Sequence, residues 1–241
     1  MILKIQQQTP EWLAERCGRI TGSRVCDVMS RLKNGKPSTK RQNYLIELVS
    51  ERLTGMAAEH YVTNAMVWGA ETERDARGAY EAESGNEVDK VGMAIHPNID
   101  CFSASPDGSI GADGLFEAKC PTTATHIEWM LAGEVPDEHK DQCYAEMACW
   151  ERDWVDFVSF DPRVPPQHQL FIKRLERDEK RIAEIEFAIV EFNAEIDDVI
   201  AKLNGMNPFK EQLRKSVAMD ESAMGITEAD IEWIKQQQGI A

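Results

Sequence analysis

The sequence has no long hydrophobic run, and no apolar stretch approaches the ~20 residues that a helix needs to cross a bilayer. The first residues, Met1 to Ile5 followed by three glutamines, lack the apolar core and the cleavage site of a secretory signal. There is also no internal repeat and no low-complexity tract. On these absences we expect no membrane partner and a place in the cytoplasm.

The six cysteines form no Cys-x-x-Cys pair and no cysteine–histidine cluster with the spacing of zinc ligands. A zinc site is therefore not expected. We interpret the cysteines as small, buried or half-buried side chains of a protein that works in a reducing compartment.

Basic residues are scarce, with 27 lysines and arginines against 42 acidic residues and a net charge of −15 at pH 7. This counts against general nucleic-acid binding, because neutralising phosphates requires lysine and arginine. However, no acidic residue lies between Asp27 and Glu47, and this loop-like interval holds five basic ones: Arg31, Lys33, Lys36, Lys40 and Arg41. A basic loop on an acidic body fits a protein that binds DNA at one place; a solvated charged loop is the equal alternative.

The length of 241 residues and the hydrophobic content of 42% allow one substantial domain with a real core. Asn207-Pro208 ends the last long helical pattern, and only weak helical pieces such as 227–238 follow. We predict one domain over residues 1–205 and an appendage of unassigned role over residues 206–241.

Helical and strand patterns are mixed along the chain. Helices are predicted at 9–17, from Ser23, and at 43–53, 64–84, 125–133, 136–149 and 178–204. Strands are predicted at 88–95, 99–104, 115–120, 154–160 and 169–175. The helix at 125–133 is assigned from a Thr125-x-x-Glu128 capping box. Together these predict an α/β fold in which helices flank a mixed central β-sheet.

The most specific local motif is Pro106-Asp107-Gly108 followed by Glu117-Ala118-Lys119. We predict a hairpin between the strands at 99–104 and 115–120, with Glu117 and Lys119 on one face and Asp107 across from them. Two hard oxygen ligands suit magnesium, and the lysine can stabilise negative charge beside it. The motif alone leaves a second interpretation open, because Asp-Gly turns and solvated Glu-x-Lys edges are common.

Three further positions carry alternatives. Glu73 lies on the apolar face of the helix at 64–84, so it is either a third acidic group of the metal site or the ion-pair partner of Arg77. Arg16 and Ser23 flank a glycine-rich helix break and can bind a phosphate, or they can be ordinary caps. By its pattern alone, Gln142 is a surface residue.

Several motifs occur in an order that makes a family resemblance specific: Trp12 to Arg16, Ile20-Thr21-Gly22-Ser23, Trp68-Gly69 with Glu73, Ser105-Pro106-Asp107-Gly108, Glu117-Ala118-Lys119-Cys120-Pro121, Gln142 before Met147, and Asp161-Pro162-Arg163. From Trp12 to about Leu203 the sequence resembles the phage lambda exonuclease and YqaJ-type viral recombinase family of restriction-endonuclease-like nucleases. The resemblance implies a restriction-endonuclease-like core. It also implies a toroidal homotrimer that degrades one strand of duplex DNA from its 5′ end, in a bacterium or a phage-infected cell.

The resemblance also implies roles for individual residues. Magnesium, with manganese as a substitute, would be bound by Asp107, Glu117 and the carbonyl of Ala118, with Glu73 nearby and Lys119 catalytic. The terminal 5′-phosphate would be bound by Arg16, Ser23, Ser105 and Gln142. Lys33 and Lys36 would contact the downstream duplex, and Met66 would be an apolar wedge at the fork. A single-strand annealing protein is the expected partner. The sequence departs from the family at Tyr144, where a second glutamine is frequent, and in its longer tail.

Two other functions remain as alternatives. A sequence-specific restriction endonuclease needs side chains that read bases in the major groove, and none is identified. A non-catalytic scaffold that binds DNA ends would be expected to lose the metal ligands or the lysine, yet Asp107, Glu117 and Lys119 are all present.

Overall fold

The computed structural model describes residues 1–58 and 63–206, and the chain divides into two units, Met1–Asp197 and Asp198–Ala241. The second unit is described only to residue 206, where it contains the end of helix α7 (Glu179–Gly205). The predicted helix at 227–238 lies outside the described residues, and the predicted boundary after residue 205 stays a prediction. None of the described helices is long and apolar enough to span a membrane.

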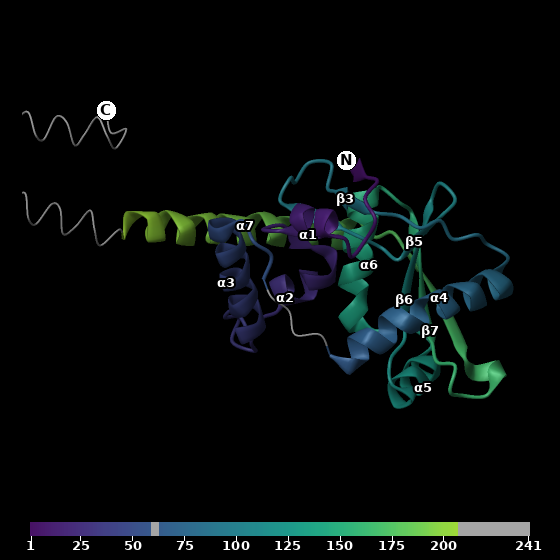
Figure 1. Cartoon of the computed structure of the whole chain (residues 1–241). Coiled ribbons are helices and arrows are strands. Elements are labelled where there is room, and N and C mark those ends of the chain that lie inside the picture. Colours follow the sequence, from purple (N-terminus) through teal and green to yellow (C-terminus); the bar gives the residue numbers. More distant parts are fainter. Residues whose placement is uncertain (59–62, 207–241) are drawn as a thin grey trace, which may run out of the picture. The chain divides into compact units, whose positions relative to one another are not determined.

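The first unit has a mixed α/β fold with helices against two four-stranded mixed sheets (Figure 1). The first sheet has the order β1 (Ile2–Leu3), β3 (Met93–Ile95), β4 (Phe102–Ala104) and β2 (Ile20–Thr21). The second has the order β5 (Gly108–Ile110), β6 (Gly114–Lys119), β7 (Trp154–Phe160) and β8 (Leu170–Glu176). The α/β class is confirmed, but the structure has two sheets where one was expected.

The predicted hairpin between 99–104 and 115–120 is wrong. Strand β4 belongs to the first sheet, whereas β6 pairs with the short strand β5 through the turn at 111–113. The sequence pattern missed β5 because three residues, Gly-Ser-Ile, are too few to show alternation. On its other edge β6 pairs in parallel with β7, so the strand that carries the Glu-x-Lys motif is central in its sheet.

Helix ends follow local capping. Helix α1 (Pro10–Arg16) begins after Thr9, whose side chain accepts a hydrogen bond from the backbone of Trp12. Helix α4 (Asn64–Ser84) begins after Thr63 and ends at Gly85, which has the left-handed φ of 73° that glycine favours. Helix α5 (Thr123–Ala132) begins after Thr122, whose side chain accepts from the backbone of Thr125. The predicted capping box at Thr125 was therefore placed three residues too late.

The basic interval after α2 (Val25–Met29) is only partly a loop. Helix α3 (Thr39–Thr54) begins after Ser38, whose side chain accepts from the backbone of Arg41, so the predicted start at residue 43 is too late. Arg41 is 2% exposed, and its guanidinium forms two hydrogen bonds with Glu195 at 2.6 and 2.9 Å. Arg41 is thus a structural cation, and the solvent-facing basic loop contains Lys33 and Lys36.

Helix α6 (Asp137–Trp150) contacts β3 and β4 of the first sheet and β6 and β7 of the second (Figure 1). Its buried residues include Cys143 and Cys149; Cys26, by contrast, is exposed, against the prediction for the cysteines. Helix α4 packs against β6, β7 and β8, with the ring of Tyr80 5.1 Å from that of Phe116. These contacts bring β6, α4 and α6 together where the polar motifs lie.

Candidate active site

Strand β6 separates its side chains by face. Phe116 and Ala118 are buried in the core cluster under α4, whereas Glu117 and Lys119 point to the other side. Glu117 is 2% exposed, and its Oε1 lies 2.5 Å from Nζ of Lys119. Asp107, which directly precedes β5, joins them, because its Oδ2 accepts a hydrogen bond from the backbone N–H of Ala118 at 2.8 Å. The structure thus brings together the three residues of the motif.

Helix α6 contributes two residues to this cluster. Nε2 of Gln142 donates to Oε1 of Glu117 at 2.5 Å and to Oε1 of Glu146 at 2.9 Å. The interpretation of Gln142 as a surface residue is therefore wrong. Sequence reasoning missed Glu146, which is 1% exposed. The sequence did contain a signal for Glu146, because this acidic residue stands next to Met147 among the buried positions of the helix.

Charges in the cluster perturb each other's protonation. Burial, followed by the charge of Glu117, raises the pKa of Asp107 well above its usual range, although Lys119 opposes the shift. Burial and Glu117 likewise raise the pKa of Glu146 well above its usual range. Burial alone would lower the pKa of Lys119, but Glu117 and Asp107 outweigh it and raise that pKa above its ordinary value. Lys119 is therefore a cation at neutral pH.

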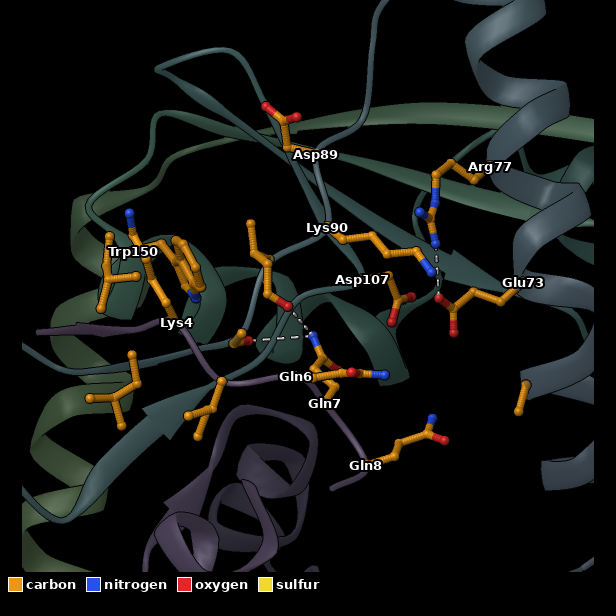
Figure 2. A pocket seen from close by; sticks show the side chains of 16 residues that line it. Lys4, Gln6, Gln7, Gln8, Glu73, Arg77, Asp89, Lys90, Asp107 and Trp150 are labelled. Carbon is orange, nitrogen blue, oxygen red and sulfur yellow. Dashed lines mark hydrogen bonds and ion pairs between the residues drawn. The ribbon is translucent and has the colours of Figure 1, made fainter. Parts of the chain in front are cut away.

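Glu73 approaches from α4. Its Oε1 lies 3.5 Å from Nη2 of Arg77, and both residues line a cavity of about 990 Å³ together with Asp107 (Figure 2). Burial raises the pKa of Glu73, with Arg77 opposing the shift and the charge of Glu117 adding to it. The ion pair with Arg77 is thus confirmed, and the role of Glu73 as a third acidic group of a metal site stays a prediction.

The donor set fits a hard divalent cation. Carboxylate oxygens are the ligands that magnesium prefers, and Oε2 of Glu117 is buried without a hydrogen-bond partner among the described residues. The mutual repulsion of Asp107, Glu117 and Glu146 is what a bound cation would relieve. Within residues 1–58 and 63–206, no three acidic, histidine or cysteine side chains are already gathered around one point as a metal would hold them.

A second cavity, of about 390 Å³, is lined by Arg16, Ser23 and Met66. The guanidinium of Arg16 stacks on the ring of Trp12 at 4.2 Å, and burial lowers its pKa. Arg16 forms no ion pair with any other described residue. Nε1 of Trp12 donates to Oγ of Ser105 at 3.1 Å, two residues before Asp107. A half-buried guanidinium with no ion-pair partner among the described residues, in a cavity that Ser23 also lines, suits a phosphate group.

The other predicted DNA-contacting residues line neither cavity. Lys33 and Lys36 are exposed in the loop between α2 and α3, where the backbone N–H of Leu32 donates to the carbonyl of Lys36 at 2.8 Å. Gln142 contacts the acidic cluster and does not line the Arg16 cavity. The structure therefore brings together Arg16, Ser23 and Met66, and links Ser105 to them through Trp12.

The turn Asp161-Pro162-Arg163 has a structural explanation. The carboxylate of Asp161 accepts hydrogen bonds from Nε of Arg163 at 2.7 Å and from Oγ1 of Thr123 at 2.6 Å. Arg163 also donates to the carbonyl of Pro121 at 2.9 Å and stacks on the ring of Trp68 at 4.7 Å. The turn therefore holds the chain that leaves β6 against α4.

Comparison with known proteins is consistent with this geometry. Residues 11–153 match the YqaJ-like viral recombinase domain. The fold matches LHK-Exo, an alkaline exonuclease from Laribacter hongkongensis, with 42% identity, a TM-score of 0.76, and coverage of 88% of this chain and 100% of that one. The complex of LHK-Exo with dAMP matches with the same identity, TM-score and coverage.

A phage-related exonuclease from Haemophilus somnus matches in fold alone, at 16% identity and a TM-score of 0.60, with coverage of 77% of this chain and 96% of that one. No curated protein sequence matches the chain.

Proposed function

The chain belongs to the family of YqaJ-like viral recombinases, and on that premise we propose that it is a magnesium-dependent 5′→3′ exonuclease of double-stranded DNA. It would release 5′-mononucleotides and leave a 3′ single-stranded overhang for recombination by strand annealing. The observation that carries the proposal is the gathering of Asp107, Glu117 and Lys119 at one end of β6, where Lys119 donates to Glu117 and the backbone N–H of Ala118 donates to Asp107. The complex of the related LHK-Exo with dAMP, a nucleoside monophosphate, supports a nucleotide product.

The cation would be held by Asp107, Glu117 and the backbone carbonyl of Ala118, with Glu73 nearby, and manganese would substitute for magnesium. When bound, a divalent cation supplies Lewis-acid polarisation of the phosphate and lowers the pKa of water. The protein's own part is to keep Glu117 oriented. Lys119 and Gln142 both bond its Oε1, which leaves Oε2 available.

Lys119 stabilises negative charge at the reacting phosphate. Because it is a cation held beside the carboxylates, its charge is in place before the reaction and needs no reorganisation. This electrostatic role fits the raised pKa better than a role as general base, which would need the neutral amine.

The end of the DNA strand would be recognised in the Arg16 cavity. Arg16 and Ser23 line it, and Ser105 reaches it through Trp12, so these residues suit the terminal 5′-phosphate. Gln142 is placed with them by family resemblance only. Met66, 53% exposed at the same cavity, suits an apolar wedge at the fork. The exposed Lys33 and Lys36 would contact the downstream duplex.

The proposal extends to assembly and partners. A homotrimer with a central channel would shield the DNA from the acidic exterior, whose net charge is −15. The overhang would pass to a single-strand annealing protein in the cytoplasm of a bacterium or a phage-infected cell. A scaffold without catalysis is disfavoured, because the structure keeps Glu117 paired with Lys119 and Asp107 bonded to the backbone of Ala118 between them.

The test is cleavage of end-labelled linear duplex, with and without a 5′-phosphate, in magnesium and in EDTA. We expect labelled 5′-mononucleotide from the phosphorylated end in magnesium only, and no cleavage of closed circular duplex. Lys119→Ala, purified identically, controls for a contaminating nuclease. Release from the 3′ end, or cutting of the circle, would contradict the proposal, and the second result would favour the endonuclease alternative.

A further inference from the structure

The cavity of about 990 Å³ beside Asp107 is lined by basic side chains to which the proposed mechanism gives no role. Its walls are the N-terminal segment 2–8, the segment 89–92 and helix α4, which contributes Glu73 and Arg77 (Figure 2). It shares no lining residue with the Arg16 cavity. Its charged lining has as many basic as acidic side chains, in a chain of net charge −15: Lys4, Arg77 and Lys90 against Glu73, Asp89 and Asp107. Basic side chains therefore border Asp107 and Glu73 in this cavity.

Arg77 has unused hydrogen-bonding capacity. Its side chain is only 12% exposed, and its single ion pair among the described residues is the 3.5 Å contact between Nη2 and Glu73. Its Nε is buried and has no hydrogen-bond partner in residues 1–58 and 63–206. A guanidinium has five N–H donors, and leaving buried donors unpaired costs free energy. If Arg77 only anchored Glu73, we would expect two short hydrogen bonds between them, like the bonds of 2.8 and 2.9 Å between Arg174 and Asp156.

Lys90 approaches the same point from another segment. It is exposed and forms no ion pair with any described residue. In Figure 2 its amine end lies close to Arg77 and Glu73, above Asp107. A lysine and an arginine therefore converge beside the catalytic carboxylates, although like charges repel. Such convergence is typical of a site that binds an anion with more charge than the carboxylate already there.

The N-terminal segment forms a built wall of this cavity. Nε2 of Gln7 donates to the carbonyls of Val91 at 3.1 Å and Pro106 at 2.8 Å, which ties the segment to the chain entering Asp107. A Cβ at Gly92 would lie 2.3 Å from the carbonyl oxygen of Leu3, so the segment packs directly on Gly92.

Gln8 adds a backbone signature to this wall. It adopts a left-handed φ of 64°, a conformation that is strained for a residue other than glycine and that is frequent at functional sites. With Gln6, it presents an amide to the cavity, and amides can donate to and accept from a base or sugar.

Building on the exonuclease function proposed above, we propose that Arg77 and Lys90 form a second phosphate-binding subsite, in the cavity walled by residues 2–8. The ligand is a nucleotide phosphate. It has two possible sources, a phosphodiester of the strand under degradation or the phosphate of the released 5′-mononucleotide. The Arg16 cavity holds the terminal phosphate, and the Arg77–Lys90 subsite holds another phosphate near Asp107.

The test uses Lys90→Gln in the full-length chain, because Lys90 is exposed and its replacement leaves the core intact. Lys180→Gln, at another exposed lysine, makes the same charge change on α7. Arg77→Lys and Arg74→Lys form the second pair, since Arg74 lies on the same helix with its side chain 86% exposed. Binding of a fluorescein-labelled, 5′-phosphorylated duplex is measured by anisotropy in EDTA, across a salt series. In magnesium, KM, kcat and the inhibition constant of 5′-dAMP are measured.

If the subsite binds the strand, Lys90→Gln weakens duplex binding roughly threefold to tenfold and reduces the salt slope by about one phosphate contact, and KM rises more than kcat falls. If it binds the product, the inhibition constant of 5′-dAMP rises instead, and duplex binding stays near that of wild type. In either case Arg77→Lys shifts the same quantity, and the two controls shift none.

Lys90→Gln and Arg77→Lys that match their controls in all these measurements would overturn the proposal. A wild-type protein that cleaves nothing would instead refute the exonuclease function, while the anisotropy measurements would still decide whether Lys90 and Arg77 bind phosphate.

Discussion

The carboxylate of Asp107 accepts a hydrogen bond from the backbone N–H of Ala118 at 2.8 Å. This contact crosses the hairpin of β5 and β6 and explains the spacing of the motif, because a short strand and a three-residue turn return the chain to Asp107. The bond places Asp107 beside Glu117 within one hairpin. The second hydrogen-bond partner of Glu117 is Gln142, which lies on α6. Helix α5 separates α6 from β6 along the chain.

Lys119→Ala should abolish cleavage and leave the binding of DNA ends largely intact. The lysine acts on charge in the transition state, and removing one such donor costs on the order of a hundredfold or more in kcat. Single-turnover cleavage and anisotropy binding separate the two quantities, with Lys180→Ala as a control for the loss of a surface lysine. Turnover within a few-fold of wild type would remove Lys119 from the mechanism.

Asp107→Ala and Glu117→Ala should each weaken magnesium and manganese binding and remove activity. In the wild type, the affinity for manganese should rise with pH. The raised pKa of Asp107 means that a proton competes with the cation at low pH and is released on binding. Calorimetric titration at two pH values, in buffers of different ionisation enthalpy, measures both affinity and proton release. Unchanged affinity in both variants would show that the hairpin is only structural.

Arg16→Ala should reduce the preference for 5′-phosphorylated ends more than it slows cleavage of 5′-hydroxyl ends. A guanidinium–phosphate contact is worth about 1.5–3 kcal/mol, or roughly tenfold to a hundredfold in the ratio of the two rates. Rates on both substrates give this ratio, and Arg74→Ala controls for the loss of an arginine. Equal losses on both substrates would mean that Arg16 supports only the stack on Trp12.

Replacing Lys33 and Lys36 together with glutamine should shorten the run of nucleotides removed per binding event and flatten its salt dependence. Both are exposed and outside the two cavities, so the first nucleotide should still be released at saturating enzyme. Product ladders in the presence of a DNA trap measure the run. Light scattering of the wild type should report a mass near three chains, and a processive monomer would refute the ring.

Asp161→Asn should destabilise the protein by about 2 kcal/mol at neutral pH, because the carboxylate holds Arg163 and Thr123. Burial alone would raise the pKa of Asp161, but hydrogen bonds from Arg163 and Thr123 outweigh it and lower the pKa to about 2. The stabilisation is therefore complete above the ordinary pKa near 3.8 and is lost as pH falls toward 2.

Denaturant unfolding at pH 7 and pH 3 measures this difference, with the half-exposed Asp75→Asn on α4 as control. Equal stability of Asp161→Asn and wild type at pH 7 would contradict the structural role of the turn.

Local features of this protein were predictable from the sequence, because they depend on interactions over a few residues. The caps at Thr9 and Gly85 delimit helices through backbone hydrogen bonds that the nearby residues determine. Strand alternation placed Glu117 and Lys119 on one face, and the mixture of helical and strand patterns predicted the α/β fold class. The assignments of the site residues to metal, phosphate and DNA remain predictions.

Only the tertiary structure decided which distant residues meet. It divided the strands between two sheets, buried Arg41 against Glu195, and brought Gln142 and Glu146 to Glu117. It also placed Arg77 and Lys90 in one cavity with Asp107. Such contacts join residues far apart in the chain, and their energy depends on burial and on the charges nearby. Neither is fixed by the residues adjacent in the sequence, so a local pattern can identify a charged side chain but not its partner.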